Sequence, residues 1–239
     1  MVASANGVVA WRRRPGEDPV LAILGGDRTH PARLADKLHM RYLRCFGDVG
    51  VGAETVRAQP ELILTPQQPG DPPLPELFAF RARAALPPQP RNIVYSLLGR
   101  LPLGHRIFTT PGIHPLVVTT PVGGPEIRRR ARGAPPPALL IEELTDPAGL
   151  RRAHEKLFAD FGVRYLDCEG GETILRALRA ADLLDEVFVT STPVVIDESA
   201  HEGVLKILDF AREGATLIAE GRATADERWT FRRWRFSRR

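Results

Sequence analysis

The residues best suited to chemistry lie in the glycine-rich segment Glu169–Thr173. The segment Val163–Cys168 before it predicts a buried strand, and a helix is expected to begin near Glu172. Gly170 and Gly171 have no Cβ atoms, so a phosphate group can approach the backbone closely. The free N–H groups and the positive dipole end at the helix start would bind such an anion. A plain strand-to-helix turn without a ligand explains this spacing equally well.

A second segment, Asp48–Arg57, repeats the order of strand, glycines and helix start. It is not a dinucleotide-binding fingerprint, because Gly50 and Gly52 are not followed by the required third glycine. Two glycine turns at strand ends nevertheless favour a nucleotide cofactor, which has several phosphates and a ribose to hold. Glu169 also follows a strand directly, and ligands of open α/β sheets bind at this end of the strands. A capping or loop role is the alternative for this carboxylate.

Other reaction classes lack their characteristic residues. The chain has no Gly-Lys-Ser/Thr phosphate-binding loop and no Gly-x-Ser-x-Gly nucleophile elbow. Its six histidines are scattered, without a His-Glu-x-x-His pair, and the zinc-deaminase signature is absent. Two cysteines, Cys45 and Cys168, cannot form a disulfide framework. No metal site is therefore predicted.

The composition is that of a globular protein. Of 239 residues, 43% are hydrophobic and 26% are charged, which excludes disorder. The length fits a single domain over residues 1–239, with two small domains as the alternative. No apolar run approaches the roughly 18 residues that a membrane span needs. The N-terminus does not read as a signal peptide. We therefore expect a soluble, cytoplasmic protein without a membrane partner.

The net charge of +4 comes largely from 30 arginines, six of which lie in the last twelve residues. Such a tail is typical of nucleic-acid binding, and the alternative is a solvated terminal strand. A bulge at Arg232–Arg233 would place four aromatic residues on one face of this strand. These residues are Trp229, Phe231, Trp234 and Phe236. We therefore predict a strand that covers a core, and no nucleic-acid partner.

The rest of the pattern predicts the elements that position these segments. Strands are predicted over Val2–Ser4, Val20–Leu24, Asp48–Val51, Asn92–Tyr95, Leu116–Thr120, Leu139–Ile141, Val163–Cys168, Glu186–Thr192, Ala215–Glu220 and Arg228–Phe236. Helices are predicted over Pro31–Phe46, Pro75–Ala85, Pro147–Phe161 and Thr173–Ala181. Proline-rich stretches at 65–75 and 132–137 are expected to be loops. This alternation predicts an α/β fold with a mixed, mostly parallel sheet and a C-terminal antiparallel hairpin.

Several of these segments together resemble a known family. The stretch from Glu169 to Ile196 has a Glu-Gly-Gly turn, a short helix, Leu-x-Asp-Glu and a strand followed by proline. It is similar to the riboflavin-biosynthesis (pyrimidine) reductase family, the C-terminal domain of the bifunctional deaminase/reductase. Three further stretches match in chain order: Val2–Gly7, Leu43-Arg44 with Val51–Pro60, and Asn92–Pro102.

The resemblance implies a three-layer αβα, dihydrofolate-reductase-like fold in one reductase domain, with NADPH as cofactor. It implies that the ribose of a 5-amino-6-(5-phosphoribosylamino)pyrimidine is reduced to the ribityl chain. It implies that Glu169 faces the substrate, and we predict that Glu169 is the catalytic residue, which orients substrate hydroxyls and assists proton transfer. Substrate contacts are implied at Asp27 (or its neighbour Arg28), Arg44 and Leu62. NADPH contacts are implied at Ala3, Thr55, Gln59, Ser96, Gly170, Gly171, Glu172 and Thr173. Many family members are dimers, so a homodimer is expected.

The chain also departs from the family pattern. Asn6 stands where the family usually has Asp, Gln59 replaces an acidic residue, and Thr65 lies near a position where an arginine is expected. Loss of that arginine would weaken the binding of a phosphorylated substrate. The sequence therefore leaves two alternatives: a reductase of another pteridine- or pyrimidine-like compound, and a nucleotide-binding regulator with weak catalysis.

Overall fold

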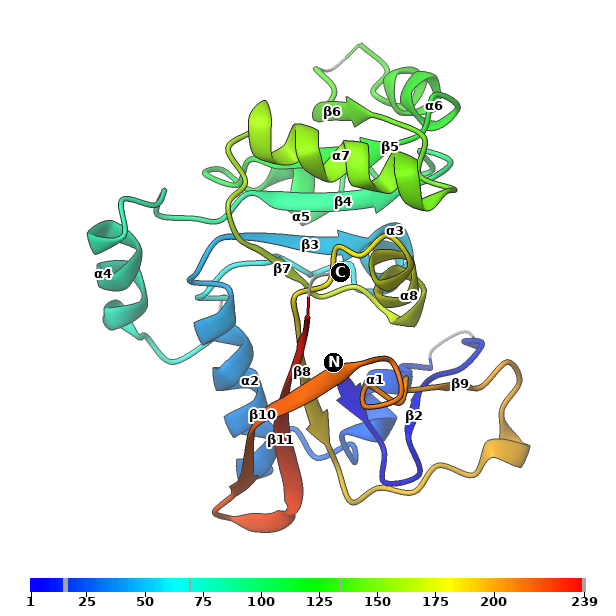
Figure 1. Ribbon diagram of the computed structural model, residues 1–239. Helices are drawn as coiled ribbons and strands as arrows, with labels where there is room; N and C mark the ends of the chain where they lie inside the picture. Colours follow the sequence, from blue (N-terminus) through cyan, green and yellow to red (C-terminus); the bar gives the residue numbers. More distant parts are fainter. Residues whose placement is uncertain (15–16, 69, 134, 238–239) are drawn as a thin grey trace. The chain divides into compact units, whose positions relative to one another are not determined.

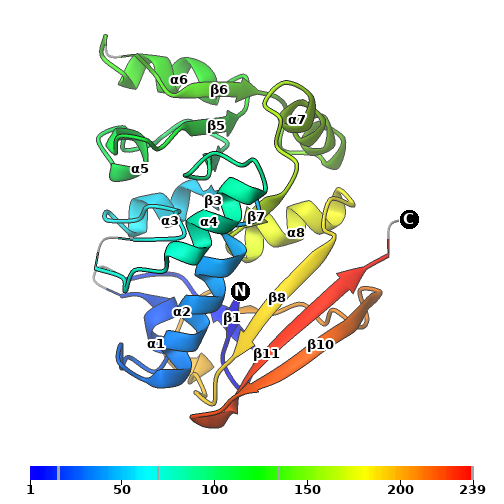
Figure 2. The same ribbon diagram turned by 90° about the vertical axis from the view of Figure 1, so that its left-hand side faces the viewer.

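The computed structural model describes residues 1–14, 17–68, 70–133 and 135–237 (Figures 1 and 2). The chain divides into two compact units. We call His39–Ala181 the parallel unit, and Met1–Leu38 with Asp182–Arg239 the hairpin unit. Pro69 and Ala134, in the two proline-rich stretches, and the terminal Arg238 and Arg239 lie outside the described residues.

A five-stranded sheet forms the centre of the parallel unit. Its order is β6-β5-β4-β3-β7, and each neighbouring pair is parallel. The strands are β3 (Asp48–Gly52), β4 (Asn92–Ser96), β5 (Pro115–Thr119), β6 (Ala138–Ile141) and β7 (Leu166–Cys168). Every residue of the central strand β4 is buried, as expected for a parallel strand with helices on both faces.

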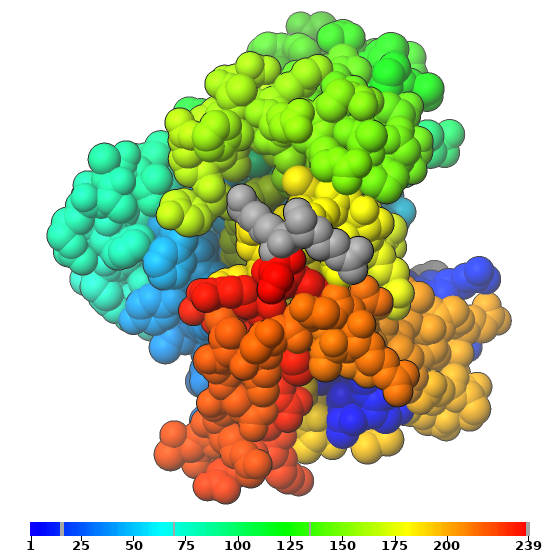
Figure 3. Space-filling model, in the orientation of Figure 1, coloured from blue at the N-terminus to red at the C-terminus, as the bar shows by residue number. Residues whose placement is uncertain are grey.

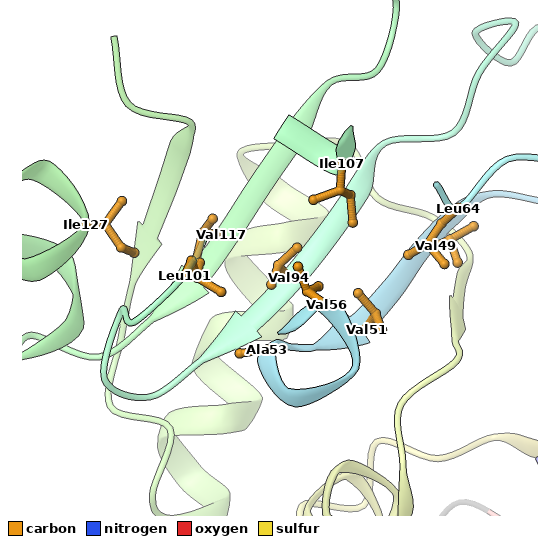
Figure 4. Packing of buried hydrophobic residues seen from close by; sticks show 10 residues of the cluster. All are labelled: Val49, Val51, Ala53, Val56, Leu64, Val94, Leu101, Ile107, Val117 and Ile127. Atoms are coloured by element: carbon orange, nitrogen blue, oxygen red, sulfur yellow. The ribbon is translucent and has the colours of Figure 1, made fainter. Parts of the chain in front are cut away.

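Helices cover both faces of this sheet and complete three layers. On one face lie α3 (Ala53–Ala58), α5 (Arg106–Thr109) and α6 (Gly123–Arg130). Their Val56, Ile107 and Ile127 join a buried cluster with residues of β3, β4 and β5, including Val94 and Val117 (Figure 4). The other face carries α7 (Pro147–Ala159) and α8 (Glu172–Ala180), on the opposite side of the strands from α3 and α5 (Figure 2). The unit also contains α4 (Pro75–Arg83).

The local sequence explains why α7 begins where it was predicted. Asp146 accepts a hydrogen bond from the backbone N–H of Gly149 at 2.8 Å, and Pro147 occupies the first helical turn. The predicted apolar stripe of Leu150, Ala153 and Leu157 is buried. The predicted helix over Pro31–Phe46 is also present as α2 (Pro31–Leu43), which crosses from the hairpin unit into the parallel unit.

The hairpin unit contains a mixed sheet in the order β1-β8-β11-β10. These strands are β1 (Val2–Ala3), β8 (Glu186–Ser191), β10 (Ala215–Ala223) and β11 (Asp226–Phe236). β1 pairs with β8 in parallel, whereas β10 and β11 form the predicted antiparallel hairpin. The edge strand β10 is exposed at most of its positions and lies at the surface, orange in Figure 3. Shorter elements are β2 (Val8–Ala10), α1 (Pro19–Ile23), the 3-10 turn η1 (Glu198–Ala200) and β9 (Leu205–Lys206).

The strand predicted at Val20–Leu24 is wrong, because this segment forms helix α1. Asp18 accepts hydrogen bonds from the N–H groups of Val20 and Leu21 at 3.0 and 3.3 Å, and Pro19 occupies the first turn. Both features are helix-start signals. The apolar run is too short for its periodicity to separate a strand from a buried helix.

The bulge predicted at Arg232–Arg233 is also wrong. β11 pairs with β8 without interruption, and its pairing with β10 is irregular at two other places, between Leu217 and Ala219 and between Arg222 and Ala223 of β10. The four aromatic residues therefore divide between two faces. Trp229 and Phe231 pack in a cluster with Leu24 and Ala32. Trp234 and Phe236 contact the ring of Phe210 instead.

Four arginines of the basic terminal strand pair with carboxylates of their own sheet. Arg232 pairs with Glu220, Arg233 and Arg235 share Glu186, and Arg228 pairs with Asp226 at the hairpin turn. Such pairing leaves the strand little free positive charge.

The α/β class, the mostly parallel pairing and the C-terminal hairpin are as predicted. No helix in the described ranges is long and apolar enough to cross a membrane. The single domain over residues 1–239 stays a prediction.

Candidate active site

The carboxyl edge of the parallel sheet brings most of the predicted site residues together. β3 ends at Gly52 and leads directly into α3, and β4 ends at Ser96. β7 ends at Cys168, and Glu169 follows it with its backbone N–H bonded to the carbonyl of Gly50 at 2.8 Å. This edge is where ligands bind in open α/β sheets.

Glu169 and Arg44 form a buried ion pair. The Arg44 Nη2 donates to Glu169 Oε2 at 2.7 Å, and its Nε donates to Oε1. The Arg44 side chain is 6% exposed and that of Glu169 is 13% exposed. Burial opposes the charge of Arg44, but the facing carboxylate outweighs it and raises the pKa of the guanidinium. Sequence reasoning placed both residues at the substrate, and the structure shows that they bind each other.

The backbone that carries Arg44 is held by a second buried arginine. One Nη of Arg81 donates to the carbonyls of Arg44, Cys45 and Gly47 at 3.2, 3.1 and 3.0 Å. A Cβ at Gly47 would lie 2.2 Å from the carbonyl oxygen of Tyr165, so this position requires glycine. The segment after α2 is therefore fixed against the chain that enters β7, which sets Arg44 opposite Glu169.

Asp167 is a further acidic group at this site, and sequence reasoning missed it. It is the middle residue of β7 and lies two residues before Glu169. Its Oδ2 atom is buried and has no hydrogen-bond partner among the described residues. Burial, together with the charge of Glu169, raises the pKa of Asp167 to about 7. The signal in the sequence was an aspartate inside a segment predicted as a buried strand, Val163–Cys168.

The two predicted glycine turns meet at one side chain, Ile174 of α8. A Cβ on Gly52 would lie 3.1 Å from Ile174, and one on Gly170 would lie 2.8 Å from it. Gly170 is therefore required by packing. Gly171 is different, because no atom lies within 4 Å of its Cβ position. Both α3 and α8 begin at a glycine without a side-chain cap, so their first N–H groups remain available to an anion.

The next two residues of this turn differ in exposure. The Glu172 side chain is buried and pairs with Arg176 at 2.7 Å. Burial raises the pKa of Glu172. Thr173 is exposed. A role of Glu172 in cofactor binding would therefore involve its backbone rather than its carboxylate.

Three further predicted residues lie on α3 or just after it. Thr55 is half-buried within α3, and its carbonyl accepts from the N–H of Gln59 at 3.0 Å. The Gln59 carbonyl is also 2.8 Å from Nε2 of His105. Leu62 is half-buried and packs against the core cluster under the sheet. Their roles toward cofactor and substrate stay predictions.

Ser96 organises the loop that follows β4. Its hydroxyl accepts from the N–H of Gly99 at 3.2 Å, and its carbonyl accepts from the hydroxyl of Thr119 at 2.6 Å. A Cβ on Gly99 would lie 2.2 Å from the carbonyl of Gly123, so the loops after β4 and β5 touch backbone to backbone. Sequence reasoning matched the loop after β4, within Asn92–Pro102, to the family, but it did not predict the contact with the loop after β5.

Two predicted residues belong to the hairpin unit. Ala3 is buried in β1, and its carbonyl accepts from the N–H of Thr192 at 2.9 Å. Asp27 is exposed and accepts from the N–H and hydroxyl of Thr29, each at 2.8 Å. Within the ranges that the structure describes, no three His, Cys, Asp or Glu side chains come together as metal ligands would.

The sequence and the fold are those of a known family of reductase domains. Residues 18–219 match the family described as the RibD C-terminal domain, and the chain belongs to this family. No curated protein matches the chain.

Solved structures share the fold at low sequence identity. RibD of Acinetobacter baumannii (form 2) is 19% identical with a TM-score of 0.63, over 99% of this chain and 56% of that one. A pyrimidine reductase-like protein of Corynebacterium diphtheriae is 17% identical with a TM-score of 0.67, over 100% of this chain and 90% of that one. A diaminohydroxyphosphoribosylaminopyrimidine deaminase/5-amino-6-(5-phosphoribosylamino)uracil reductase of Thermotoga maritima is 14% identical with a TM-score of 0.60, over 99% of this chain and 55% of that one. The chain thus spans little more than half the length of the RibD structure and of the deaminase/reductase.

Proposed function

We propose that this protein is an NADPH-dependent reductase of riboflavin biosynthesis. Its substrate would be a 5-amino-6-(5-phosphoribosylamino)pyrimidine, whose ribose is reduced to the ribityl chain. The observation that carries the proposal is the Arg44–Glu169 pair beside the glycine turn of α8, in a chain of the RibD C-terminal domain family.

The turns at the carboxyl edge fit a dinucleotide cofactor. Gly171 has open space at its Cβ position, and α8 begins without a side-chain cap. The backbone of Gly171 to Thr173 would hold a phosphate of NADPH, and Thr55 would add a hydroxyl from α3. When bound, NADPH supplies the hydride, so the protein's task is to bind, orient and exclude water.

Glu169 is the residue we propose to orient the sugar. Arg44 donates to both carboxylate oxygens, which fixes the rotamer of Glu169 and leaves it lone pairs to accept hydrogen bonds from sugar hydroxyls. We propose that Asp167, with its raised pKa, is the group beside it that retains a proton near neutral pH. In this arrangement Arg44 is a positioning residue and Glu169 is the catalytic residue.

One observation favours a second substrate class on the same scaffold. Besides Glu169, Arg44 donates to the carbonyl of Thr65 at 3.1 Å, so its guanidinium is committed to the protein. Thr65, which lies near the position where the family has an arginine, carries no charge that could bind a phosphate. A pteridine or aminopyrimidine without a phosphate would not need a cation there.

The remaining proposals concern the whole chain. We propose that residues 1–239 act together as one cytoplasmic reductase domain, and as a homodimer. The ion pairs of Arg228, Arg232, Arg233 and Arg235 with neighbouring carboxylates support the absence of a nucleic-acid partner. Light scattering of the purified protein tests the dimer, which a monomeric mass would contradict.

The test of function is NADPH oxidation by the purified protein with each candidate substrate. We expect oxidation of NADPH with a phosphoribosylaminopyrimidine, either before or after its deamination. We expect no oxidation of NADPH without a substrate. Turnover restricted to an unphosphorylated pteridine would establish the second substrate class. NADPH binding without oxidation of any of these would instead indicate a regulator.

A further inference from the structure

Arg41 is a buried arginine next to Arg44 that the proposed reaction does not use. It lies in α2, and the N–H of Arg44 continues the helical hydrogen bonding to the carbonyl of Met40 at 3.1 Å, so the two arginine side chains are neighbours. Arg41 is 4% exposed. A buried guanidinium is costly unless it is paired and hydrogen-bonded, so its partners show what it holds in place.

The Arg41 guanidinium binds the proline-rich loop that follows β3 and α3. We call residues 65–68 and 70–72 the proline loop. Nε donates to the carbonyl of Pro66 at 2.7 Å, and Nη2 donates to the carbonyl of Pro72 at 2.9 Å. Asp71, whose side chain is 1% exposed, lies 3.7 Å from Nε and supplies the opposite charge. Arg41 therefore ties both ends of the proline loop to α2.

The proline loop contains no helix or strand, and hydrogen bonds of its side chains hold its shape. Gln67 accepts from Nη2 of Arg41 at 2.5 Å, and its own Nε2 donates to the carbonyl of Asp71 at 2.7 Å. The N–H of Gln68 donates to Oδ2 of Asp71 at 3.1 Å. The hydroxyl of Thr65 donates to the carbonyl of Gln67 at 2.7 Å. Because these bonds cross the loop, a hold on its two ends also fixes Thr65.

Thr65 connects the proline loop to the proposed catalytic carboxylate. Its carbonyl accepts from Nη1 of Arg44 at 3.1 Å, while Nε and Nη2 of Arg44 donate to Glu169. Arg44 thus lies between a neutral acceptor and the carboxylate, so a shift of Thr65 would let the guanidinium turn relative to Glu169. A displacement of about 1 Å at a positioned catalytic group can cost about 100-fold in rate.

We propose that Arg41 is a positioning residue for Glu169, which acts through the proline loop and Arg44. The proposal rests on the proposed function, in which Glu169 orients the sugar. The arrangement requires a planar guanidinium, because its Nε and Nη2 reach the two ends of the loop at once. A lysine at this position would keep the charge beside Asp71, but it has one nitrogen in place of these two.

Kinetics of Arg41→Met and Arg41→Lys test this role. We expect each variant to lower kcat about 10-fold or more, because Glu169 loses its orientation, while the NADPH Kd changes less than about 2-fold. Arg41→Lys retains the charge opposite Asp71, so it also serves if Arg41→Met does not fold. Wild-type kcat in Arg41→Lys would overturn the proposal, since charge alone would then be sufficient.

The matched control is Arg91→Met, at the opposite edge of the same sheet. The Arg91 side chain is 29% exposed, lies 4.0 Å from Asp48 and donates to the carbonyl of Phe161 at 2.7 Å. Its loss should lower Tm without lowering kcat. An equal fall of kcat in Arg91→Met and Arg41→Met would overturn the proposal, because general destabilisation would then explain both.

A double-mutant cycle shows whether Arg41 acts through Glu169. In the Glu169→Gln background, Arg41→Met should lower kcat less than about 2-fold, because the carboxylate that it positions is already gone. Losses that multiply in the double variant would overturn the proposal, because Arg41 would then act independently of Glu169.

The hold on Arg44 is measured without turnover by NMR of ¹⁵N-labelled protein. The Nε–H resonance of Arg44 is assigned by its absence from Arg44→Met. We expect this proton to exchange with solvent at least about 10-fold faster in Arg41→Met than in the wild type, and at the wild-type rate in Arg91→Met. Unchanged exchange in Arg41→Met would overturn the proposal even if the enzyme oxidises NADPH. Faster exchange in a protein that oxidises no NADPH would contradict the proposed function and support the hold of Arg41 on Arg44.

Discussion

Replacement of Glu169 by glutamine is the perturbation whose consequences follow most directly from the structure. The change keeps the shape of the side chain and removes its charge, so the buried Arg44 guanidinium loses its counter-ion. It also turns an amide N–H₂ toward a guanidinium that can only donate. The Arg44 side chain still donates to the carbonyl of Thr65, and its backbone carbonyl still accepts from Arg81. The guanidinium therefore cannot easily become exposed to solvent.

The expected cost can be estimated from burial. Removing one partner of a buried ion pair typically destabilises a protein by about 3–5 kcal/mol. The Glu169 side chain is 13% exposed, so we expect the lower end, about 3 kcal/mol of unfolding free energy. For a chain of this length, that corresponds to a fall of roughly 6–12 °C in Tm.

A double-mutant cycle in urea isolates the pair. Glu169→Gln, Arg44→Met and the double variant are compared, and we expect a coupling energy of about 2 kcal/mol or more because the double variant leaves no unpaired charge. The control is Glu61→Gln, which breaks the exposed pair with Arg106 and should leave the unfolding midpoint nearly unchanged. Additive single effects, with coupling below about 0.5 kcal/mol, would refute the buried pair.

Three further predictions address the same edge. Asp167→Asn should change how stability depends on pH: the folded pKa of about 7 exceeds the ordinary 3.8, so wild-type unfolding free energy falls as pH rises from about 4 to about 7. The variant should lack this fall in urea titrations at pH 5 and pH 8, and parallel curves would contradict the raised pKa. Gly170→Val should lower Tm by contact with Ile174, whereas Gly171→Val should keep Tm and weaken NADPH binding at least 10-fold; the reverse pattern in thermal and fluorescence titrations would contradict the assigned roles. Glu169→Gln should lower kcat about 100-fold or more while the NADPH Kd holds, and normal turnover would remove its catalytic role.

The elements with strong local signals were predictable from the sequence. The strands β3, β4 and β5 are apolar on both faces, and the helices α2, α4 and α7 begin with proline. The hydrophobic pattern and the helix-start residues are therefore sufficient to predict these elements. Val20–Leu24 was misassigned because five apolar residues suit a strand and a buried helix alike. β2 and β9 were missed because strands of three and two residues carry no period.

The site was predictable in type but not in arrangement. The glycines and Glu169 were found because chain-local rules describe strand-to-helix turns. The partner of Arg44 lies 125 residues away, and no local pattern encodes that contact. The same is true of Asp167, whose raised pKa depends on burial and on the charge of Glu169.

The destination of the hydride tests the central proposal most directly. The purified protein is given NADPH deuterated at nicotinamide C4 together with the phosphoribosylaminopyrimidine, and the product is examined by mass spectrometry and NMR. We expect one deuterium on the first carbon of a newly formed ribityl chain, and formation of this labelled product at least about 100-fold slower in Glu169→Gln. Oxidation of the cofactor without label in the pyrimidine product, or an unchanged ribosyl group, would contradict it.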